Sequence, residues 1–193
     1  MFSATPKVLN EHLATATGHA WVTVDARYRT LRLANLLTPG GRGKGVARLD
    51  FADAAKIIIA VMAADTAAEG EGAVDRYFHL PLVRYINHEN SPPDIQVQSK
   101  ESTRFKQFGI GLAAVIESFK QPNAILRRSV SVSSDELASI LYGDTDFYYG
   151  LGPPTTSVNH EENWYRLNDT MTTERTLPYG AIEHIAAAFV WAP

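Results

Sequence analysis

The segment at residues 36–49 has the sequence LLTPGGRGKGVARL. It holds four of the chain's 13 glycines together with the cations Arg42, Lys44 and Arg48, and it has no acidic residue. Glycine permits tight turns and lets the backbone approach a ligand closely, while clustered cations attract anions. The segment therefore predicts a loop that meets negative charge, either on a bound nucleotide or on the backbone of DNA.

The position and the spacing of these glycines disfavour a nucleotide loop. Such a loop follows a strand and opens a helix, so that phosphate meets free backbone N–H groups. Here a helical pattern precedes the glycines and a strand pattern follows them. A GxxxxGK[ST] motif ending after Lys44 would need glycine where Thr38 stands and serine or threonine where Gly45 stands. A GxGxxG motif starting at Gly41 would need glycine in place of Val46.

Two helices are predicted before this segment. Pro6 suits a first helical turn and Gly18 a helix end, which predicts a helix between them. A second helical pattern runs from about residue 20 to residue 34, and Asn35 can adopt the left-handed conformation that ends it.

The glycine-rich segment, defined as residues 38–45 (TPGGRGKG), is predicted to connect two strands. These are Leu36 with Leu37, and residues 46–49. Two helices followed by a basic hairpin, or wing, would place one helix in the major groove and the hairpin against the neighbouring phosphates. A plain flexible surface hairpin is the alternative.

The order of these motifs resembles that of bacterial and phage winged helix-turn-helix DNA-binding domains. Their usual run is a Leu-Ala helix, a turn glycine, a Thr-Val recognition helix and a Leu-Arg-x-x-Gly-Leu-Leu passage into the wing. The corresponding residues here are Leu13-Ala14, Gly18, Thr23-Val24, Leu31-Arg32 and Asn35-Leu36-Leu37-Thr38-Pro39-Gly40-Gly41-Arg42-Gly43. Asn35 stands where glycine is common, and Trp21 is bulkier than the small polar residue often found early in the recognition helix. The resemblance covers about residues 6–64 and implies binding to double-stranded DNA.

Individual roles follow as hypotheses from the second helix and the loop. Thr23, Arg27 and Thr30 share a polar face, and Arg27 could bond bidentately to a guanine. The other basic residues are expected to contact phosphates, which position a protein without specifying sequence, and those of the loop could also enter a minor groove. Trp21 either packs on a sugar or fills the core. The residues predicted to bind DNA are Lys7, Trp21, Thr23, Arg27, Arg29, Thr30, Arg32, Arg42, Lys44 and Arg48.

Charge is unevenly distributed along the chain, whose 193 residues carry a net charge of −3. Residues 1–48 carry +5 and the remainder carries −8. This asymmetry suggests a polyanion-binding end joined to a part with another task, although a basic solvated helix face would give the same count. The small acidic stretch AAEGEGAVD at residues 67–75 is the candidate boundary, which predicts domains at 1–68 and 69–193.

The predicted fold class is α+β, with an N-terminal winged helix-turn-helix followed by a small mixed α+β domain. Asp50 or Asp53 can cap a helix that continues to about residue 68. Beyond it, helices are predicted at residues 110–119 and 181–190. Strands are predicted at residues 125–132, 164–167 and 172–177.

The sequence offers little support for catalysis, and we expect no cofactor and no metal. HEENW at residues 160–164 begins like a zinc protease helix, but Trp164 replaces the second histidine of HExxH. The chain has no cysteine nucleophile, and it has no Gly-x-Ser-x-Gly motif, which would indicate an activated serine. No signal peptide is evident, and the most apolar run, at residues 57–64, is far shorter than the roughly 20 residues of a membrane span. We therefore expect a cytoplasmic protein without a membrane partner.

The leading hypothesis is a sequence-specific transcriptional regulator of phage or prophage type that binds double-stranded DNA. One recognition helix reads only a few base pairs, so a homodimer is expected. The acidic C-terminal domain, residues 69–193, is expected to mediate this association or to bind an effector, and it could also bind a protein partner. Two other hypotheses remain: a nucleoprotein assembly factor, such as a packaging or replication-initiation subunit, and an enzyme carried by residues 75–193.

Overall fold

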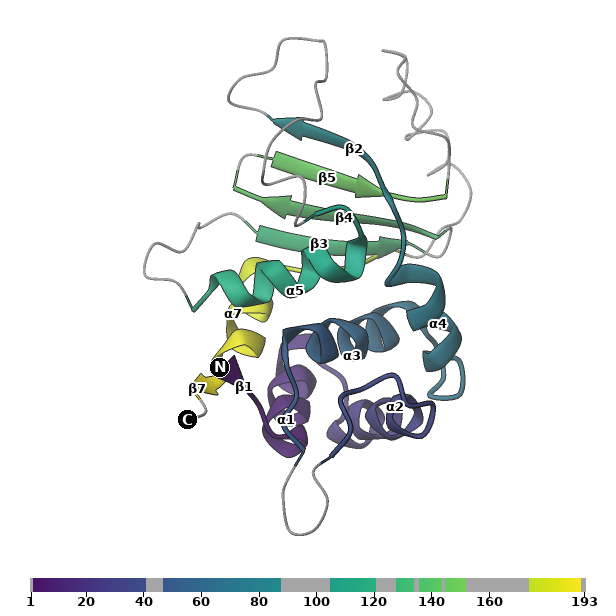
Figure 1. The fold of residues 1–193 in the computed structure, drawn as a ribbon, viewed down its shortest axis with the longest axis vertical. Coiled ribbons are helices and arrows are strands. Elements are labelled where there is room, and N and C mark those ends of the chain that lie inside the picture. Colours follow the sequence, from purple (N-terminus) through teal and green to yellow (C-terminus); the bar gives the residue numbers. More distant parts are fainter. Residues whose placement is uncertain are drawn as a thin grey trace.

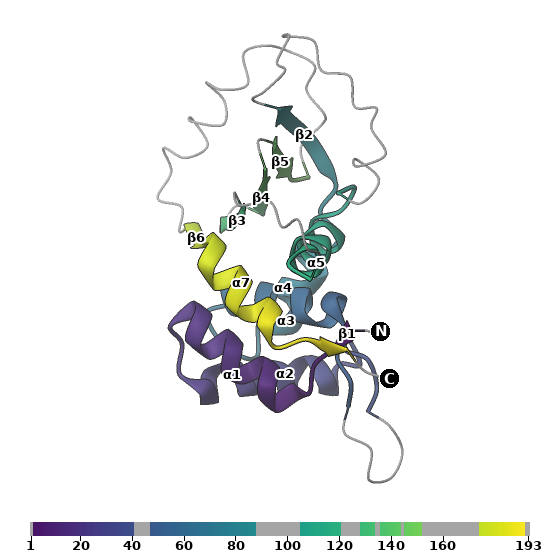
Figure 2. The same ribbon diagram turned by 90° about the vertical axis from the view of Figure 1, so that its left-hand side faces the viewer.

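The computed structural model of the chain describes residues 2–40, 47–87, 105–120, 128–133, 136–143, 145–151 and 174–191. Its N-terminal part is helical and contains α1 (Pro6–Thr17), α2 (Trp21–Leu33), α3 (Phe51–Ala63) and α4 (Gly70–Tyr77). Helices α1 and α2 form the end of the molecule opposite the sheet, and α3 lies between them and the rest of the fold (Figures 1 and 2).

The other part of the molecule is built on a five-stranded antiparallel sheet. Its strands are β2 (Leu82–Asn87), β3 (Arg128–Ser133), β4 (Leu137–Tyr142), β5 (Thr145–Tyr149) and β6 (Glu174–Leu177), in the spatial order β2-β5-β4-β3-β6. Helices α5 (Phe108–Ser118) and α7 (Tyr179–Ala187) lie between this sheet and the N-terminal helices (Figure 1). The mixed α+β class predicted from the sequence is thereby confirmed.

The two ends of the described chain meet. Strand β1 (Phe2–Ser3) pairs antiparallel with β7 (Val190–Trp191). Helix α1 also packs on α7, where the rings of His12 and His184 lie 4.5 Å apart between centroids. The C-terminal elements are therefore held against the N-terminal helices.

Local signals set the ends of the first three helices, as predicted. Gly18 ends α1 with φ of 71°, and Asn35 follows α2 with φ of 58°. Asp50 caps α3 by accepting from the backbone N–H of Asp53, whose own carboxylate accepts from the N–H of Asp50. This reciprocal capping box satisfies two N–H groups that a helix start leaves without partners.

Helix α3 is the central element of the core. It is apolar on nearly all sides and packs against α2, α4 and α5, as a fully buried helix must. It ends at Ala63, earlier than the predicted end near residue 68, because Ala64 is already extended. The hydrophobic residues around it form one cluster in space. Its members range along the sequence from Ala4 to Phe189, so the cluster includes residues on both sides of the predicted boundary at residue 69. The division into two domains stays a prediction.

The predicted pairing of strands at the base of the wing is wrong for its described residues. Leu36 and Leu37 belong to no strand, and Leu49 forms an isolated antiparallel bridge with Ala4. The backbone of the first segment is bound by side chains of α3 instead: Lys56 Nζ donates to the carbonyl of Leu36 at 2.6 Å, and the Thr38 N–H donates to Asp53 Oδ1 at 3.0 Å. Residues 41–46, with Arg42 and Lys44, lie outside the described residues, and the winged helix stays a prediction.

Candidate nucleic-acid interface

Helix α2 is the element on which most of the predicted DNA contacts fall. It follows α1 after a short turn at Gly18 and packs on both α1 and α3. Its buried face holds Val24, Tyr28 and Leu31, as expected for a core-facing stripe, and also Arg27. The opposite face is exposed to solvent. One face of α2 therefore packs in the core, and the other is accessible to a partner.

The predicted contact between Arg27 and a guanine is wrong, because Arg27 is buried within the fold with only 4% of its surface exposed. Its Nε donates to the carbonyl of Ala60 at 3.0 Å, and its Nη2 donates to those of Ala64 at 2.9 Å and Asp65 at 3.1 Å. A third nitrogen, Nη1, donates to the carbonyl of Thr23 at 3.3 Å. Arg27 thus binds α2 to the C-terminal end of α3, where helix carbonyls lack helical partners.

A second arginine, which sequence analysis did not single out, binds the same helix end. Arg175 of β6 donates through Nη1 to the carbonyl of Met62 at 2.8 Å and through Nη2 to the carboxylate of Asp65. Burial lowers the pKa of the Arg27 guanidinium, and the charge of Arg175 lowers it further, whereas Asp65 and Glu69 oppose this shift. Both arginines therefore act as structural ties, one from each side of α3.

The solvent face of α2 carries a stripe of Val22, Ala26, Arg29 and Leu33, hereafter the outer stripe, all of which are exposed. Arg29 lies on it with 70% of its side chain exposed and forms an ion pair with Asp25 at 2.7 Å. The carboxylate of Asp25 also accepts from the amide of Asn10 on α1, at 3.3 Å. The acid next to the stripe, Asp25, is therefore half-buried and already paired within the protein.

The remaining predicted residues of α2 lie beside the outer stripe. Trp21 and Arg32 are exposed on one flank, while Thr23 and Thr30 are half-buried on the other. The hydroxyl of Thr30 donates back to the carbonyl of Ala26 at 3.1 Å. The structure therefore brings Trp21, Arg29 and Arg32 to one accessible surface and separates Arg27 from it.

The base of the glycine-rich segment lies next to the C-terminal end of α2. An ideal Cβ on Gly40 would lie 3.6 Å from the Cβ of Ala47 and 3.8 Å from Nη2 of Arg32. Residues 40 and 47 are therefore neighbours in space, and the chain leaves and returns at one point beside Arg32. Asp53 and Lys56, which the sequence analysis gave no role in this site, fix this base to α3.

Two further predicted cations lie at the same end of the molecule. Arg48 is exposed next to Leu49, whose bridge to Ala4 places the start of α1 beside it. Lys7, in the first turn of α1, is exposed and lies 3.9 Å from Glu11. Exposed cations from α1, α2 and the segment after the loop therefore converge on one end of the fold.

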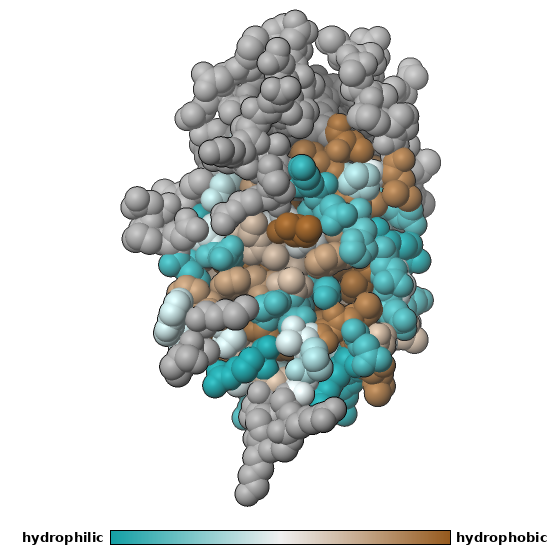
Figure 3. All heavy atoms as spheres, in the orientation of Figure 1, coloured by the Kyte–Doolittle hydropathy of each residue, from teal (hydrophilic) through white to brown (hydrophobic). Residues whose placement is uncertain are grey.

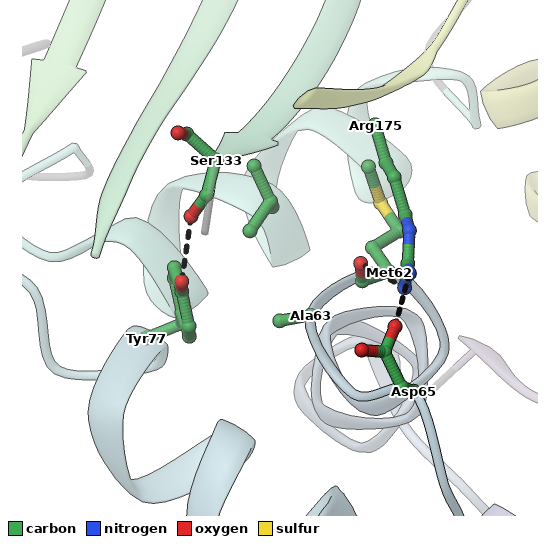
Figure 4. Close-up of a pocket in the computed structure, with 7 residues that line it drawn as sticks. Met62, Ala63, Asp65, Tyr77, Ser133 and Arg175 are labelled. Carbon is green, nitrogen blue, oxygen red and sulfur yellow. Dashed lines mark hydrogen bonds and ion pairs between the residues drawn. The ribbon is translucent and has the colours of Figure 1, made fainter. Parts of the chain in front are cut away.

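A small pocket of about 100 Å³ lies elsewhere, between the end of α3, α4 and the sheet. Figure 4 shows the ion pair of Asp65 and Arg175 on one side of it and, on the other, the Tyr77 hydroxyl donating to the carbonyl of Ser133 at 2.6 Å. Its polar groups are engaged with one another, so it serves as a junction between helices and sheet.

The chemistry of the described residues adds two observations. Among them, no three histidine, aspartate or glutamate side chains gather as ligands for a metal ion. Within the same residues, no helix combines the length and the apolar character needed to cross a bilayer. Comparison with known protein families, curated proteins and solved structures finds no significant match to this chain.

Proposed function

We propose that the chain binds double-stranded DNA through α2 and the glycine-rich segment and acts as a transcriptional regulator. The observation that supports this most is the free outer face of α2, with exposed Arg29 and Arg32 and with the base of the glycine-rich segment beside its C-terminal end. A helix that stands clear of its own fold can enter a major groove. Cations around it can contact phosphates on either side.

The charge distribution supports the same proposal. No acid occurs between Asp25 and Asp50, and Asp25 is paired with Arg29. The cations Lys7, Arg32 and Arg48 are exposed at the same end of the molecule as the outer stripe, which makes the end formed by α1 and α2 complementary to a polyanion. The acidic remainder of the chain would be repelled by DNA and would orient this end toward it.

The proposal is tested by the salt dependence of DNA affinity, measured by fluorescence anisotropy on a duplex selected from a random pool. Arg32→Ala and Arg48→Ala should each weaken binding to all duplexes and lower the slope of log affinity against log salt by about 0.9. The double variant Arg42→Ala with Lys44→Ala should lower it by up to about 1.8.

Arg76→Ala is the matched control, because Arg76 is an exposed arginine on α4 that lies 3.8 Å from Glu136 and away from the proposed interface. It should leave both affinity and slope unchanged. A pool that yields no enriched duplex would remove the proposal. Sedimentation of the complex adds the stoichiometry: two chains on one site support a regulator, and a ring supports an assembly factor.

A further inference from the structure

The outer stripe of α2 is apolar to a degree that a solvent-facing helix does not need. The exposed fractions are 67% for Val22 and 83% for Leu33, and Ala26 lies exposed between them. Apolar and polar surface lie side by side over α2 at the lower right of the space-filling view (Figure 3). Three of the four residues that would enter a groove therefore offer methyl groups and no hydrogen-bond donor.

The guanidinium groups near the stripe are poorly placed to bind guanine. Arg27 is buried and donates to four carbonyl groups of the protein itself. Arg29 lies on the stripe, but its Nη2 is held by Asp25 at 2.7 Å. Arg32 lies on the flank beside Gly40. A free arginine fork pairs strongly with guanine O6 and N7. Arg27 cannot form this pair, because its guanidinium is already bound within the protein.

We infer that the outer stripe recognises the C5-methyl groups of thymines in the major groove, with Val22 and Leu33 as specificity-determining residues. This inference rests on the proposed function and names what the recognition helix reads. Thymine presents its methyl group in the major groove, where apolar side chains distinguish it from the bare edge of cytosine. The flanking cations favour DNA over an apolar protein surface as the occupant of this face.

The geometry sets the length of DNA that the stripe covers. Val22 and Leu33 are 11 residues apart on one helix face, or about 16 Å along the axis. The two methyl contacts therefore fall at separate base pairs of one half-site. Val22, near the N-terminal end that usually meets base edges, makes the deeper contact.

The experiment replaces thymine by uracil, which removes the methyl group and keeps the base pair. A preferred duplex is first selected from a random pool made without methylated cytosine, so that thymine supplies every C5-methyl group. Each thymine is then exchanged for uracil in turn, and affinity is measured by anisotropy at constant salt. We expect a three- to fourfold loss at a few neighbouring positions, which corresponds to burial of about one methyl group each, and no loss elsewhere.

Variants link the methyl groups to named side chains. Val22→Ala should abolish the difference between thymine and uracil at one position while leaving affinity for the uracil duplex unchanged. Leu33→Ala should do the same at another position. Both residues are exposed, so neither substitution should disturb folding. Val8→Ala is the control, because Val8 is a 37% exposed valine on α1 outside the stripe.

The possible outcomes distinguish failure of the thymine-methyl inference from failure of the proposed DNA binding. If uracil is tolerated at every position while an enriched duplex still binds, the inference is overturned and the proposed function stands. If no duplex is enriched, both fall. If Val22→Ala and Leu33→Ala alter self-association instead of thymine discrimination, the stripe is a contact between copies of the chain, and the inference is overturned.

Discussion

At the scale of single residues, Arg27 carries a structural task that its position on α2 conceals. Its guanidinium donates to the carbonyls of Ala60, Ala64 and Asp65, all at or beyond the last turn of α3. These hydrogen bonds are buried or half-buried, so removal of the side chain would leave the carbonyl oxygens with fewer donors and little access to water. Unsatisfied polar groups in such places are costly. The contact is therefore a stabilising one.

Arg27→Met should lower the free energy of unfolding by about 2–4 kcal/mol, because it keeps the apolar stem and removes the donors. Arg29→Met, two residues further along α2 on its exposed face, should change it by about 0.5 kcal/mol or less. Urea denaturation of both variants measures this difference. Equal stability of the two variants would mean that the bonds of Arg27 contribute nothing to folding.

The burial of Arg27 was beyond what the sequence could predict. The helical wheel places it next to the apolar stripe of Val24, Tyr28 and Leu31, where an arginine is usually solvated. What decides its orientation is a set of carbonyls more than 30 residues away in sequence. Long-range backbone acceptors leave no mark in local periodicity, and the same holds for Arg175, whose acceptors lie more than 100 residues away in sequence.

At the scale of elements, prediction succeeded where the signal was local. Gly18, Asn35 and Asp50 mark helix ends through their own backbone preferences or hydrogen bonds, and each does so in the structure. The strands expected at residues 36–37 and 46–49 depended on a mutual pairing. In the structure, Lys56 and Asp53 bind the backbone of the first segment, and Ala4 pairs with Leu49 of the second. The sequence of these two segments does not indicate such partners.

The hairpin of β3 and β4 illustrates the same limit. By residue type alone, Ser134 or Asp135 could cap a helix start, but Leu137–Tyr142 is strand β4. Its buried residues Ala138 and Ile140 alternate with less buried ones, so packing on the sheet decided the outcome. Residues 134 and 135 themselves lie outside the described part of the chain.

The turn between α1 and α2 makes a prediction at the scale of elements. A Cβ on Gly18 would meet no atom within 4 Å, so only its positive φ opposes a side chain. Gly18→Ala should therefore cost about 1 kcal/mol of unfolding free energy through backbone strain alone. Gly72→Ala is matched in space, with no atom within 4 Å, but lies in α4 without a positive φ and should be neutral or stabilising by about 0.5 kcal/mol. The free energy of unfolding of both variants is measured by thermal and urea denaturation. Equal changes in Gly18→Ala and Gly72→Ala would contradict the role given to the positive φ of Gly18.

At the scale of the whole molecule, the helical part and the sheet share one hydrophobic cluster. Helix α3 packs on α5, α1 packs on α7, and β1 pairs with β7. Contacts of this kind couple the stability of the parts, even where composition and charge suggest a boundary at residue 69. Charge asymmetry is a property of the surface, and it gives no information about how the cores are joined.

The contact between Phe78 and Gly109 tests this coupling. A Cβ on Gly109 would lie 2.2 Å from Cδ2 of Phe78, a clash in a buried site at the start of α5. Gly109→Ala should lower stability by about 3 kcal/mol, whereas Gly180→Ala, which meets no atom within 4 Å in α7, should have little effect.

Because the clash lies outside residues 1–68, its effect on the N-terminal helices reports whether the chain unfolds as one unit. In a variant whose sole tryptophan is Trp21 on α2, fluorescence follows the N-terminal helices and far-UV circular dichroism follows the whole chain. For a single cooperative unit, Gly109→Ala shifts both transitions together to lower urea. A fluorescence transition that stays in place while the circular dichroism signal moves would show instead that residues 1–68 fold independently, as the charge distribution suggested.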